Sequence, residues 1–463
     1  MDYVPSTPLH RSLARLDRQE LAGRLHAVRT LSAVRGLRFL DDDSRPKTID
    51  LALVPWVLSP AQVAFFRRTA RLVIDALARL PSLYAGSAYA REVLPIEPEQ
   101  EAWLRLSRHP AARPLAVMGR LDSTATYAHQ DWRRTFQFLE PNAVGVGGVH
   151  YGPAGCSVIL DVLDDVLERA YPRSRVVPTP DPRQLLLAEM AHVNRRMGRK
   201  LRRIALIENV EYTTGTDEFG SLARHFRRHG LEALVVDPRE VHARNGHLTV
   251  RGREVDLLYR DCELSEFLEM EAGGRRLDGI RRAVRQGRLI SGLLWELDYK
   301  SAWELFTDPV FSRRFRPAQQ RLFHAHLPWT RLVRQAAVSG PDGRRVDLPA
   351  YIRRHRATLV LKPNTLYGGQ GVVIGARATQ GLWERTLAQA LRGGTRYVAQ
   401  EYARIATERF PVLKDGRPQW VERSVVSGFF FNSWDVGLVG RFSSDPVVNV
   451  SRGGGLLAAL MVS

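Results

Sequence analysis

Apolar residues recur along the chain at two spacings, and the spacing changes near residue 114. Residues 1–110 show mainly helical spacing. Within them, residues 59–83 open with Ser-Pro, a pair typical of a helix cap and first turn, and apolar residues then return every three to four positions. This period places them on one face of a helix, so the stretch predicts a helix that packs against a core.

Shorter apolar runs follow and predict strands. Two of them are residues 114–118 and 136–139, and a helix is expected over residues 157–170 after a glycine-rich stretch. The last third of the chain is predicted to form, in order, a strand over 359–362, a glycine-containing loop over 364–371, a returning strand over 371–374, a helix over 381–391 and a strand over 397–402.

The middle of the chain alternates between the two patterns. Residues 204–207, 233–236 and 255–259 are short apolar runs, and residues 219–229 have helical spacing and end at a glycine. Strands that alternate with helices predict a parallel sheet. No GxGxxG motif follows the first run, so the dinucleotide-binding fingerprint is absent.

Composition narrows the class of protein. The chain has 463 residues, 44% hydrophobic and 25% charged, which is ordinary for a globular protein and too long for one core, so two or three subdomains are expected. The net charge of +19 would suit nucleic acid, an anionic membrane or an acidic substrate. The basic residues are spread along the chain and no block alternates with aromatics, which favours general surface charge and argues against a nucleic-acid partner.

Other sequence features exclude further classes. The two cysteines lack CxxC spacing, so no zinc site or disulfide framework is predicted. No run of about 18 apolar residues suggests a membrane span, and the first residues lack the apolar core of a signal peptide. We therefore expect a cytoplasmic protein with free thiols.

The first candidate site lies where the predicted strand over residues 359–362 ends. Lys362 stands at its end, and Gly368, Gly369 and Gly371 follow in the loop. A lysine there can place its ammonium on a nucleotide phosphate, and a loop without side chains at three positions can close its backbone N–H groups over the phosphates. The GxxxxGK[ST] motif is absent. The alternative is an ordinary hairpin with a glycine turn.

Two further segments suit nucleotide binding. Gln400 and Glu401 end a predicted strand about 40 residues after Lys362 and can form a hinge whose backbone pairs with adenine while a carboxylate holds the amino or ribose edge. The alternative is any amphipathic strand. Lys300, at the start of a predicted amphipathic helix, is either a second phosphate-binding lysine or a solvated one.

Oxygen donors gather in the segment between residues 119 and 142. Arg120 and Asp122 are two residues apart, as are Glu140 and Asn142, and this period gives each pair one side of a strand. Asp122, Glu140 and Asn142 are hard ligands that suit Mg²⁺. Arg120 can meet the charge that develops on a transferring phosphate. The alternative is a strand of surface salt bridges.

Together these four motifs resemble the circularly permuted ATP-grasp ligases, particularly the glutathionylspermidine-synthetase-like group and, more distantly, eukaryotic-type glutathione synthetases. The order of the motifs, with metal ligands before the lysines, is that of the permuted family. The resemblance covers roughly residues 114–150 and 200–463. It implies that Arg120 stabilises the transition state and that a Tyr-Arg element ending at Arg260 binds substrate. Arg452, in a glycine-rich tail like that of glutathione synthetases, would bind a substrate carboxylate; the alternative is a flexible end.

The chain also departs from that family. Pro141 separates the metal candidates, where the family has another residue, and no amidase domain precedes the synthetase-like part, so glutathionylspermidine itself is not implied. The predicted fold is α/β (α+β), a permuted ATP-grasp. Its expected parts are an N-terminal helical region (1–113), the metal-ligand part of the core (114–200), a parallel α/β substrate-binding domain (201–285) and nucleotide-binding lobes with a glycine-rich lid (286–463).

The resulting hypothesis is an ATP- and Mg²⁺-dependent ligase that joins a small-molecule or peptide carboxylate to an amine through an acyl phosphate. Such chemistry needs neutralised phosphate charge and water exclusion, and no nucleophilic side chain. A phosphotransferase on the same scaffold and a non-catalytic basic binding protein remain as alternatives. A homodimer is possible.

Overall fold

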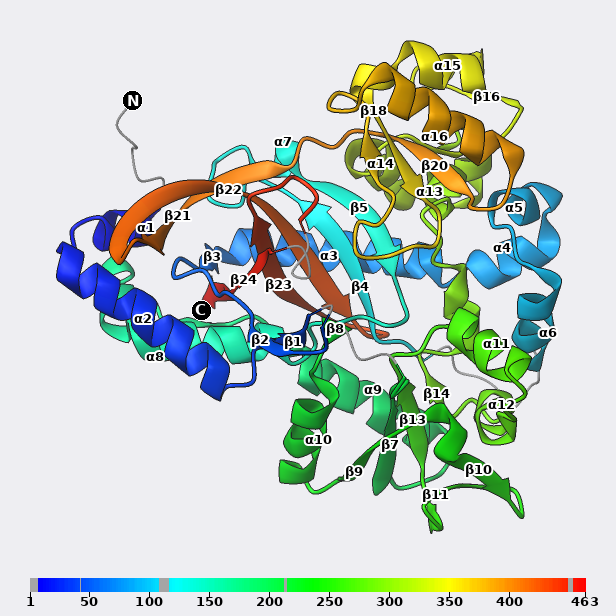
Figure 1. Cartoon of the computed structure of the whole chain (residues 1–463), viewed down its shortest axis with the longest axis horizontal. Helices are drawn as coiled ribbons and strands as arrows, with labels where there is room; N and C mark the ends of the chain where they lie inside the picture. The colour runs from blue at the N-terminus through cyan, green and yellow to red at the C-terminus, as the bar shows by residue number, and fades with distance from the viewer. Residues whose placement is uncertain (1–6, 42, 108–115, 212–214, 449–452) are drawn as a thin grey trace.

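The computed structural model describes residues 7–41, 43–107, 116–211, 215–448 and 453–463. Its strands form several sheets with helices packed around them, a mixed α/β arrangement. Figure 1 shows a large sheet in the centre, a green parallel sheet below it and a smaller yellow and orange sheet at the upper right. Within the described ranges, none of the helices combines the length and apolar character needed to span a bilayer.

The large sheet joins segments from opposite ends of the sequence. Its antiparallel strands run in the order β24 (Gly455–Leu457), β23 (Val436–Ser443), β22 (Arg417–Phe431), β4 (Gly119–Thr124) and β5 (Gln137–Asn142), and β21 (Ala406–Lys414) also pairs with β22. The strand predicted over residues 136–139 is therefore confirmed as β5. Its neighbour β4 lies against β22, about 300 residues later in the sequence, with Asp122 opposite Gly428.

The strand predicted over residues 114–118 is wrong. Residues 116–118 have no regular structure, and β4 begins only at Gly119; residues 114 and 115 lie outside the described ranges. Side chains take the place of a strand partner there, because the Val117 N–H donates to Glu189 Oε1 (3.2 Å) and the Met118 N–H donates to Ser291 Oγ (3.0 Å).

The N-terminal region is mostly helical, as predicted. Its helices are α1 (Pro8–Leu13), α2 (Arg18–Val34), α3 (Pro60–Leu77), α4 (Leu80–Gly86), α5 (Ala88–Val93) and α6 (Pro98–Leu106). Ser59 caps α3 in a capping box with Gln62. The single helix predicted over residues 59–83 is wrong in its extent. Pro81 cannot continue an α-helix because it lacks an N–H donor, so the chain ends α3 at Leu77 and begins α4 at Leu80.

The parallel sheet is confirmed. It runs in the order β14 (Leu289–Ile290), β13 (Leu257–Arg260), β7 (Arg203–Ile207) and β9 (Glu232–Val236), with each neighbouring pair parallel. The helices α10 (Phe219–Arg228), α11 (Leu264–Ala272) and α12 (Asp278–Arg285) belong to the same part of the chain, as do the antiparallel strands β10 (Val241–Arg244), β11 (His247–Val250) and β12 (Arg253–Glu254).

The smaller sheet contains the predicted lysine strand. Its order is β15 (Thr330–Leu332), β20 (Tyr397–Glu401), β18 (Leu359–Pro363) and β19 (Val373–Ile374). The helices α15 (Leu348–Arg354) and α16 (Gln380–Arg392) share its apolar core, in which Trp383 and Leu361 are fully buried. The elements predicted over residues 359–362, 371–374, 381–391 and 397–402 are confirmed within a few residues.

The remaining elements connect or cover these sheets. The helix α8 (Tyr151–Ala170) begins six residues before its predicted start. Its first turns contain Gly152, Pro153 and Gly155, which disfavour a helix in a sequence pattern, but proline is tolerated in a first turn. The other elements are α7 (Trp132–Thr135), α9 (Pro182–Arg196), α13 (Ala302–Thr307), α14 (Pro317–His326), the 3-10 helices η2 (Pro238–Glu240), η3 (Leu293–Leu297), η4 (Phe311–Arg314) and η5 (Arg356–Thr358), and the strands β1 (Arg38–Leu40), β2 (Pro46–Thr48), β3 (Trp56–Leu58), β6 (Val176–Pro178), β8 (Gly215–Thr216), β16 (Ala337–Ser339), β17 (Arg345–Asp347) and β25 (Ala459–Val462).

One partly buried acid in the large sheet makes stability depend on pH. Burial raises the pKa of Glu408 to about 7, although its hydrogen bonds from Trp56 Nε1 (3.0 Å to each oxygen) oppose the rise. The folded state therefore keeps this proton above the pH at which the unfolded chain loses it. Stability contributed by the group is present at low pH and falls as pH rises from about 4.5 to about 7.

We expect Glu408→Gln to remove this pH dependence. Relative to the variant, the wild type should lose about 2 kcal/mol of unfolding free energy between pH 5 and pH 8, a figure reduced for the partial exposure of the group. Urea unfolding at both pH values measures the difference. Equal losses in the two proteins would show that Glu408 does not titrate in this range.

Candidate active site

Four of the predicted side chains share one face of the large sheet. In the pairing of β4 with β5, Asp122 lies opposite Glu140 and Arg120 lies opposite Asn142, with a shift in register only beyond Asp122. Residues directly opposite each other in an antiparallel pair project to the same face. Pro141 occupies the position between Glu140 and Asn142 without disturbing this pairing.

Two arginines hold the Asp122 carboxylate. Arg120 Nε lies 2.7 Å from Asp122 Oδ1, and Arg441 Nη2 lies 2.8 Å from Oδ2. Burial acts to raise the pKa of Asp122, but the two guanidiniums outweigh it and lower the pKa to about 2. Gly428 leaves room for the group, because a Cβ there would lie 2.5 Å from Arg120 Cδ.

Lys362 and Gln400 meet this face from the smaller sheet. Lys362 Nζ donates to Gln400 Oε1 (2.7 Å), and Gln400 Nε2 donates to Thr330 Oγ1 (2.9 Å) and to the Leu139 carbonyl (3.4 Å). Leu139 directly precedes Glu140 on β5, so the buried Gln400 amide bridges the two sheets. Glu401 Oε2 accepts a hydrogen bond from the Trp329 N–H (3.1 Å).

Lys300 reaches the same place from a third segment. Its Nζ lies 3.6 Å from Glu140 Oε2 and donates to the Leu366 carbonyl in the glycine-containing loop (2.8 Å). Burial lowers the pKa of the Lys362 ammonium; Glu140 opposes this shift and the neighbouring Lys300 adds to it. Two ammonium groups and one carboxylate thus converge here.

Asn364 connects the loop to the Lys300 segment. Its Oδ1 accepts the Ser301 N–H (2.9 Å), its carbonyl accepts the Lys300 N–H (3.3 Å), and its buried Nδ2 has no hydrogen-bond partner among the described residues. Sequence reasoning missed this residue. Its only signal was its position two residues after Lys362.

The three loop glycines all adopt positive φ. Gly368, Gly369 and Gly371 have φ of 68°, 71° and 65°, a region that other residues rarely adopt. A Cβ at Gly369 would also lie 2.4 Å from Val447 Cγ1. The backbone conformation therefore requires glycine here, as expected of a loop that folds closely over a ligand.

The predicted substrate residues lie apart from this cluster. Arg260, at the end of β13, is 1% exposed; it forms an ion pair with Glu296, donates to the Ser291 and Cys262 carbonyls and leaves Nη2 without a partner in the described part of the chain. It does not contact the lysines. Arg452 falls outside the described residues, so its predicted role stays a prediction.

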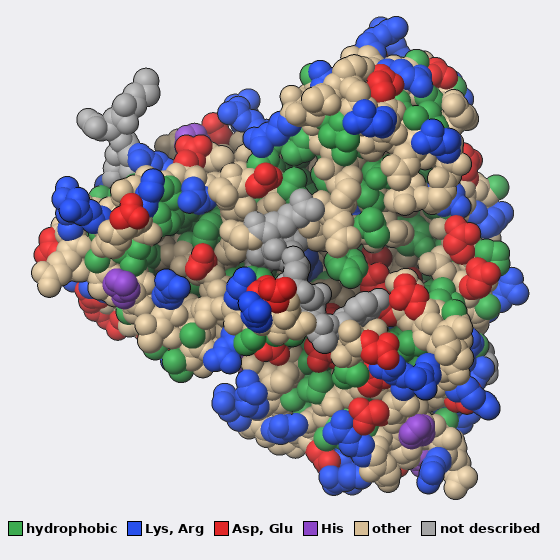
Figure 2. All heavy atoms as spheres, in the orientation of Figure 1, with side chains coloured by type: hydrophobic (Ala, Val, Ile, Leu, Met, Phe, Trp, Pro, Cys, Tyr) green, Lys and Arg blue, Asp and Glu red, His purple; other side chains and the backbone are tan. Residues whose placement is uncertain are grey.

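Buried acids line the side of the site toward the parallel sheet. Burial raises the pKa of Glu263 to about 8 and of Asp298 to about 7, and it raises the pKa of Asp261 to about 6. Asp298 accepts the N–H of Ala143, the residue after Asn142. Figure 2 shows acidic side chains beside the hollow in the middle of this face. These acids were not predicted, because they come from two separate segments, residues 261–263 and 296–298, and fit none of the motifs that the sequence suggested.

The donor set fits Mg²⁺ in part. Glu140 and Asn142 offer a carboxylate and an amide oxygen, the ligand types that Mg²⁺ binds. Among the described residues, the Asn142 side chain makes no hydrogen bond, and the Glu140 carboxylate has an ion pair only with Lys300. Asp122 differs, because both of its oxygens are held by arginines. No cluster of three or more His, Cys, Asp or Glu side chains suited to a metal occurs in the described ranges.

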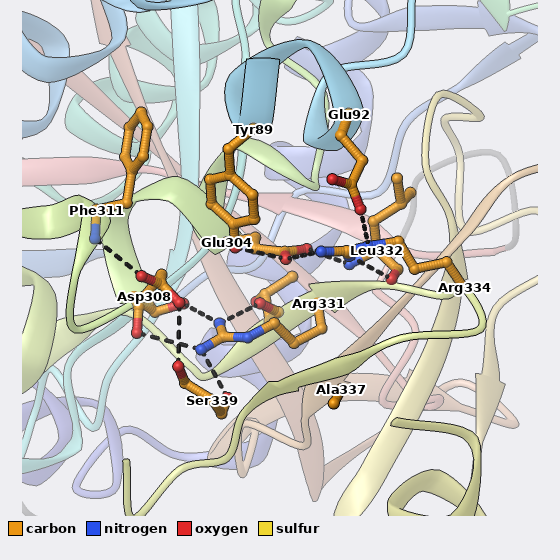
Figure 3. Close-up of polar contacts among 12 residues, drawn as sticks. Tyr89, Glu92, Glu304, Asp308, Phe311, Arg331, Leu332, Arg334, Ala337 and Ser339 are labelled. Atoms are coloured by element: carbon orange, nitrogen blue, oxygen red, sulfur yellow. Dashed lines mark hydrogen bonds and ion pairs between the residues drawn. The ribbon is translucent and has the colours of Figure 1, made fainter. Parts of the chain in front are cut away.

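A buried ionic network fixes the helix that follows Lys300. Glu304 on α13 is fully buried, accepts the Leu332 N–H of β15 (2.6 Å), and pairs with Arg334 Nη2 (2.8 Å). Tyr89 Oη also donates to it (2.9 Å). Figure 3 shows Tyr89 of α5, Leu332 of β15 and Arg334, two residues after β15, converging on the Glu304 carboxylate of α13. Since β15 pairs with β20, the network positions Lys300 relative to Gln400.

We expect Glu304→Ala to lower the free energy of unfolding by about 3 kcal/mol, because the change removes the buried carboxylate that pairs with Arg334 and leaves the Tyr89 hydroxyl and the Leu332 N–H without their acceptor. Glu384→Ala on α16 removes a carboxylate near the surface that forms an ion pair with Arg353 at 3.3 Å. This change should alter the free energy of unfolding by less than about 1 kcal/mol. Chemical denaturation compares the two variants. Equal small losses would mean that the network does not hold α13 in place.

Comparison with known proteins agrees with this architecture. No protein-family model matches the sequence, and no curated protein matches it. Among solved structures, a glutathione synthetase-like effector from Globodera pallida, in its apo form, aligns over 97% of this chain and 98% of its own, with a TM-score of 0.66 and 10% identity. The two chains share a fold. A shared fold at this identity does not establish a shared reaction.

Two other solved structures are more distant. A protein assigned as a gamma-glutamylcysteine synthetase from Methylobacillus flagellatus is 15% identical, with a TM-score of 0.40 over 84% of this chain and 87% of its own. A RimK domain ATP-grasp protein from Sphaerobacter thermophilus is 12% identical, with a TM-score of 0.26 over 56% of this chain and 90% of its own. TM-scores this low do not support an inference about the fold or the function of this chain.

Proposed function

We propose that this chain is an ATP-dependent ligase of the circularly permuted ATP-grasp kind, which joins a carboxylate to an amine. The observation that carries the proposal is the meeting of Glu140 with Lys300 at 3.6 Å, with Lys362 beside them. These groups come from three distant segments and form a cluster of charges suited to a triphosphate and its metal. Support for permutation comes from β4 and β5, which precede the lysines in sequence yet pair into the sheet of β22 and β23.

Each residue has a role in the proposed reaction. Lys300 and Lys362 neutralise the phosphates, and the glycine loop covers them with backbone N–H groups. Glu140 and Asn142 would hold Mg²⁺, which would neutralise phosphate charge. Asp122 would become a third metal ligand only after losing its ion pair with Arg120 or Arg441. Gln400 and Glu401 lie at the edge where the adenine would bind. Arg120 faces the transferring phosphoryl group.

The chemistry needs two displacements. A substrate carboxylate oxygen attacks the γ-phosphorus, and ADP leaves. The amine then attacks the acyl carbon, and inorganic phosphate leaves. The amine must lose a proton, and buried carboxylates with pKa values near neutrality, such as Glu263 and Asp298, are suited to accept it.

We assign residues 201–285, which include Arg260, to substrate binding, with an amino acid or small peptide as the expected substrate class.

Trapping the acyl phosphate tests the proposal. The protein is incubated with ATP, Mg²⁺, a panel of amino acids and small peptides, and hydroxylamine in place of the amine. We expect a hydroxamate together with ADP and phosphate for one class of acid. A phosphoester beside ADP would instead indicate a phosphotransferase, and ATP binding without any product from the panel and its amine pairs would favour a non-catalytic binding protein.

A further inference from the structure

A cavity lies away from the candidate active site. It has a volume of about 680 Å³ and lies between the end of α2, the first turns of α8 and one side of α10, elements that Figure 1 places at the lower left of the large sheet. This volume is within the range of small-molecule sites. None of the predicted nucleotide, metal or substrate residues lines it, so it is separate from the proposed ligase site.

Basic side chains dominate the cavity wall. Its lining includes five arginines, namely Arg35, Arg38, Arg183, Arg224 and Arg228, together with three histidines and a single carboxylate, Asp217. Arg35 and Arg183 form ion pairs with Asp161 and Asp181, each at 2.6 Å. Among the described residues, no acidic partner is found for Arg38, Arg224 or Arg228, so three guanidiniums around one cavity lack a counter-charge.

The rest of the wall also favours an anion. The first turn of α8 lines the cavity, and so does one side of α10 along its whole length, from Gly220 to Arg228. The partial positive charge at the N-terminus of α8 attracts anions. His225 lies in the same wall; burial, and after it the neighbouring Arg183, lower its pKa to about 4, so this imidazole is neutral at pH 7 and leaves the charge of the wall to the arginines. Arg224 Nη2 donates to Ser221 Oγ (2.8 Å), which orients this guanidinium along the wall.

We propose that this cavity binds a phosphorylated small molecule, whose phosphate is held by Arg38, Arg224 and Arg228. Guanidinium groups match the oxygens of a phosphate with paired hydrogen bonds, and the three arginines come from two elements, β1 and α10, that both line the cavity. The remaining volume accommodates an organic group the size of a sugar.

The cavity and the candidate active site lie on opposite sides of the loop formed by residues 147–150. Glu218 accepts the N–H groups of Gly148 (2.8 Å) and His150 (2.9 Å), and His150 lines the cavity. On the other side, the Gly147 carbonyl accepts Arg120 Nη1 (2.7 Å). The ligand would therefore lie one loop away from Arg120 without touching the ATP site.

Calorimetry with glucose 6-phosphate tests the proposal, with glucose as the uncharged control. We expect saturable binding of glucose 6-phosphate by the wild type at up to millimolar concentration and none of glucose. The double variant Arg224→Ala/Arg228→Ala should bind at least about tenfold more weakly, because charge-assisted hydrogen bonds are lost. Arg38→Ala, on β1, should also weaken binding.

Two control variants show whether the phosphate binds in this cavity. Arg392 is exposed and ends α16, as Arg228 ends α10, so Arg392→Ala removes an equivalent charge and should leave binding unchanged. Lys362→Met, in the proposed ATP site, should also leave it unchanged. Equal binding by the arginine double variant and the Arg392 variant, loss of binding in the Lys362 variant, or no saturable binding by the folded wild type would each overturn the proposal.

Discussion

Replacing Lys362 with methionine is expected to lower the rate of ATP turnover by about 10³-fold, the scale of losing one group that stabilises transition-state charge. Methionine keeps most of the length of the side chain, so the packing around β18 is retained. What is lost is an ammonium that lies beside Glu140 and Lys300 and donates to Gln400 at 2.7 Å. The rate of ADP formation, in the presence of an acid substrate, measures the effect.

A matched variant shows whether the effect belongs to the site. Lys414 also stands at the end of a strand, β21, but its side chain is exposed. Lys414→Met should therefore turn over ATP at the wild-type rate. If Lys362→Met melts at the wild-type temperature and still turns over ATP normally, Lys362 is not a phosphate ligand.

Glu140→Gln is expected to reduce turnover by about 10²-fold or more and to raise the Mg²⁺ concentration needed for half-maximal rate, because an amide binds Mg²⁺ less strongly than a carboxylate. The change keeps the shape of the side chain and its place opposite Asp122. It also removes the partner of Lys300. Turnover measured over a Mg²⁺ series separates a metal ligand from a residue that only positions the lysine.

Glu422→Gln is the control for this change. Glu422 lies on β22 of the same sheet but is exposed, so the variant should keep the Mg²⁺ dependence of the wild type. A Glu140 variant with reduced rate and unchanged Mg²⁺ dependence would remove Glu140 from the metal assignment while leaving its contact with Lys300 in place.

Local patterns were enough to predict most elements of the last third of the chain. The strands around Lys362 and Gln400, the helix between them and the parallel sheet all follow from apolar spacing and glycine positions. The errors have local physical causes as well. Pro81 breaks the helix expected over residues 59–83, and residues 116–118 bond to side chains rather than to a neighbouring strand.

Pairings between distant segments could not be predicted in the same way. Arg441 is the one basic residue of β23, yet only the register of β22 with both β23 and β4 brings it to Asp122. The Glu304 network likewise depends on contacts between α5, α13 and β15. The sequence resemblance predicted that Glu140, Lys300 and Lys362 would meet, because it carries long-range information that periodicity lacks, but it did not predict that Arg260 would lie apart from them. It did not predict that Asp122 would be held by two arginines.

Binding of a non-hydrolysable ATP analogue, measured by calorimetry with and without Mg²⁺, tests most directly whether Glu140, Lys300 and Lys362 surround one triphosphate. We predict saturable, Mg²⁺-dependent binding by the wild type that is weakened at least about tenfold in Lys362→Met and unchanged in Lys414→Met. A folded wild-type protein that fails to bind the analogue at millimolar concentration, or that binds it equally well without Lys362, would contradict the proposed site.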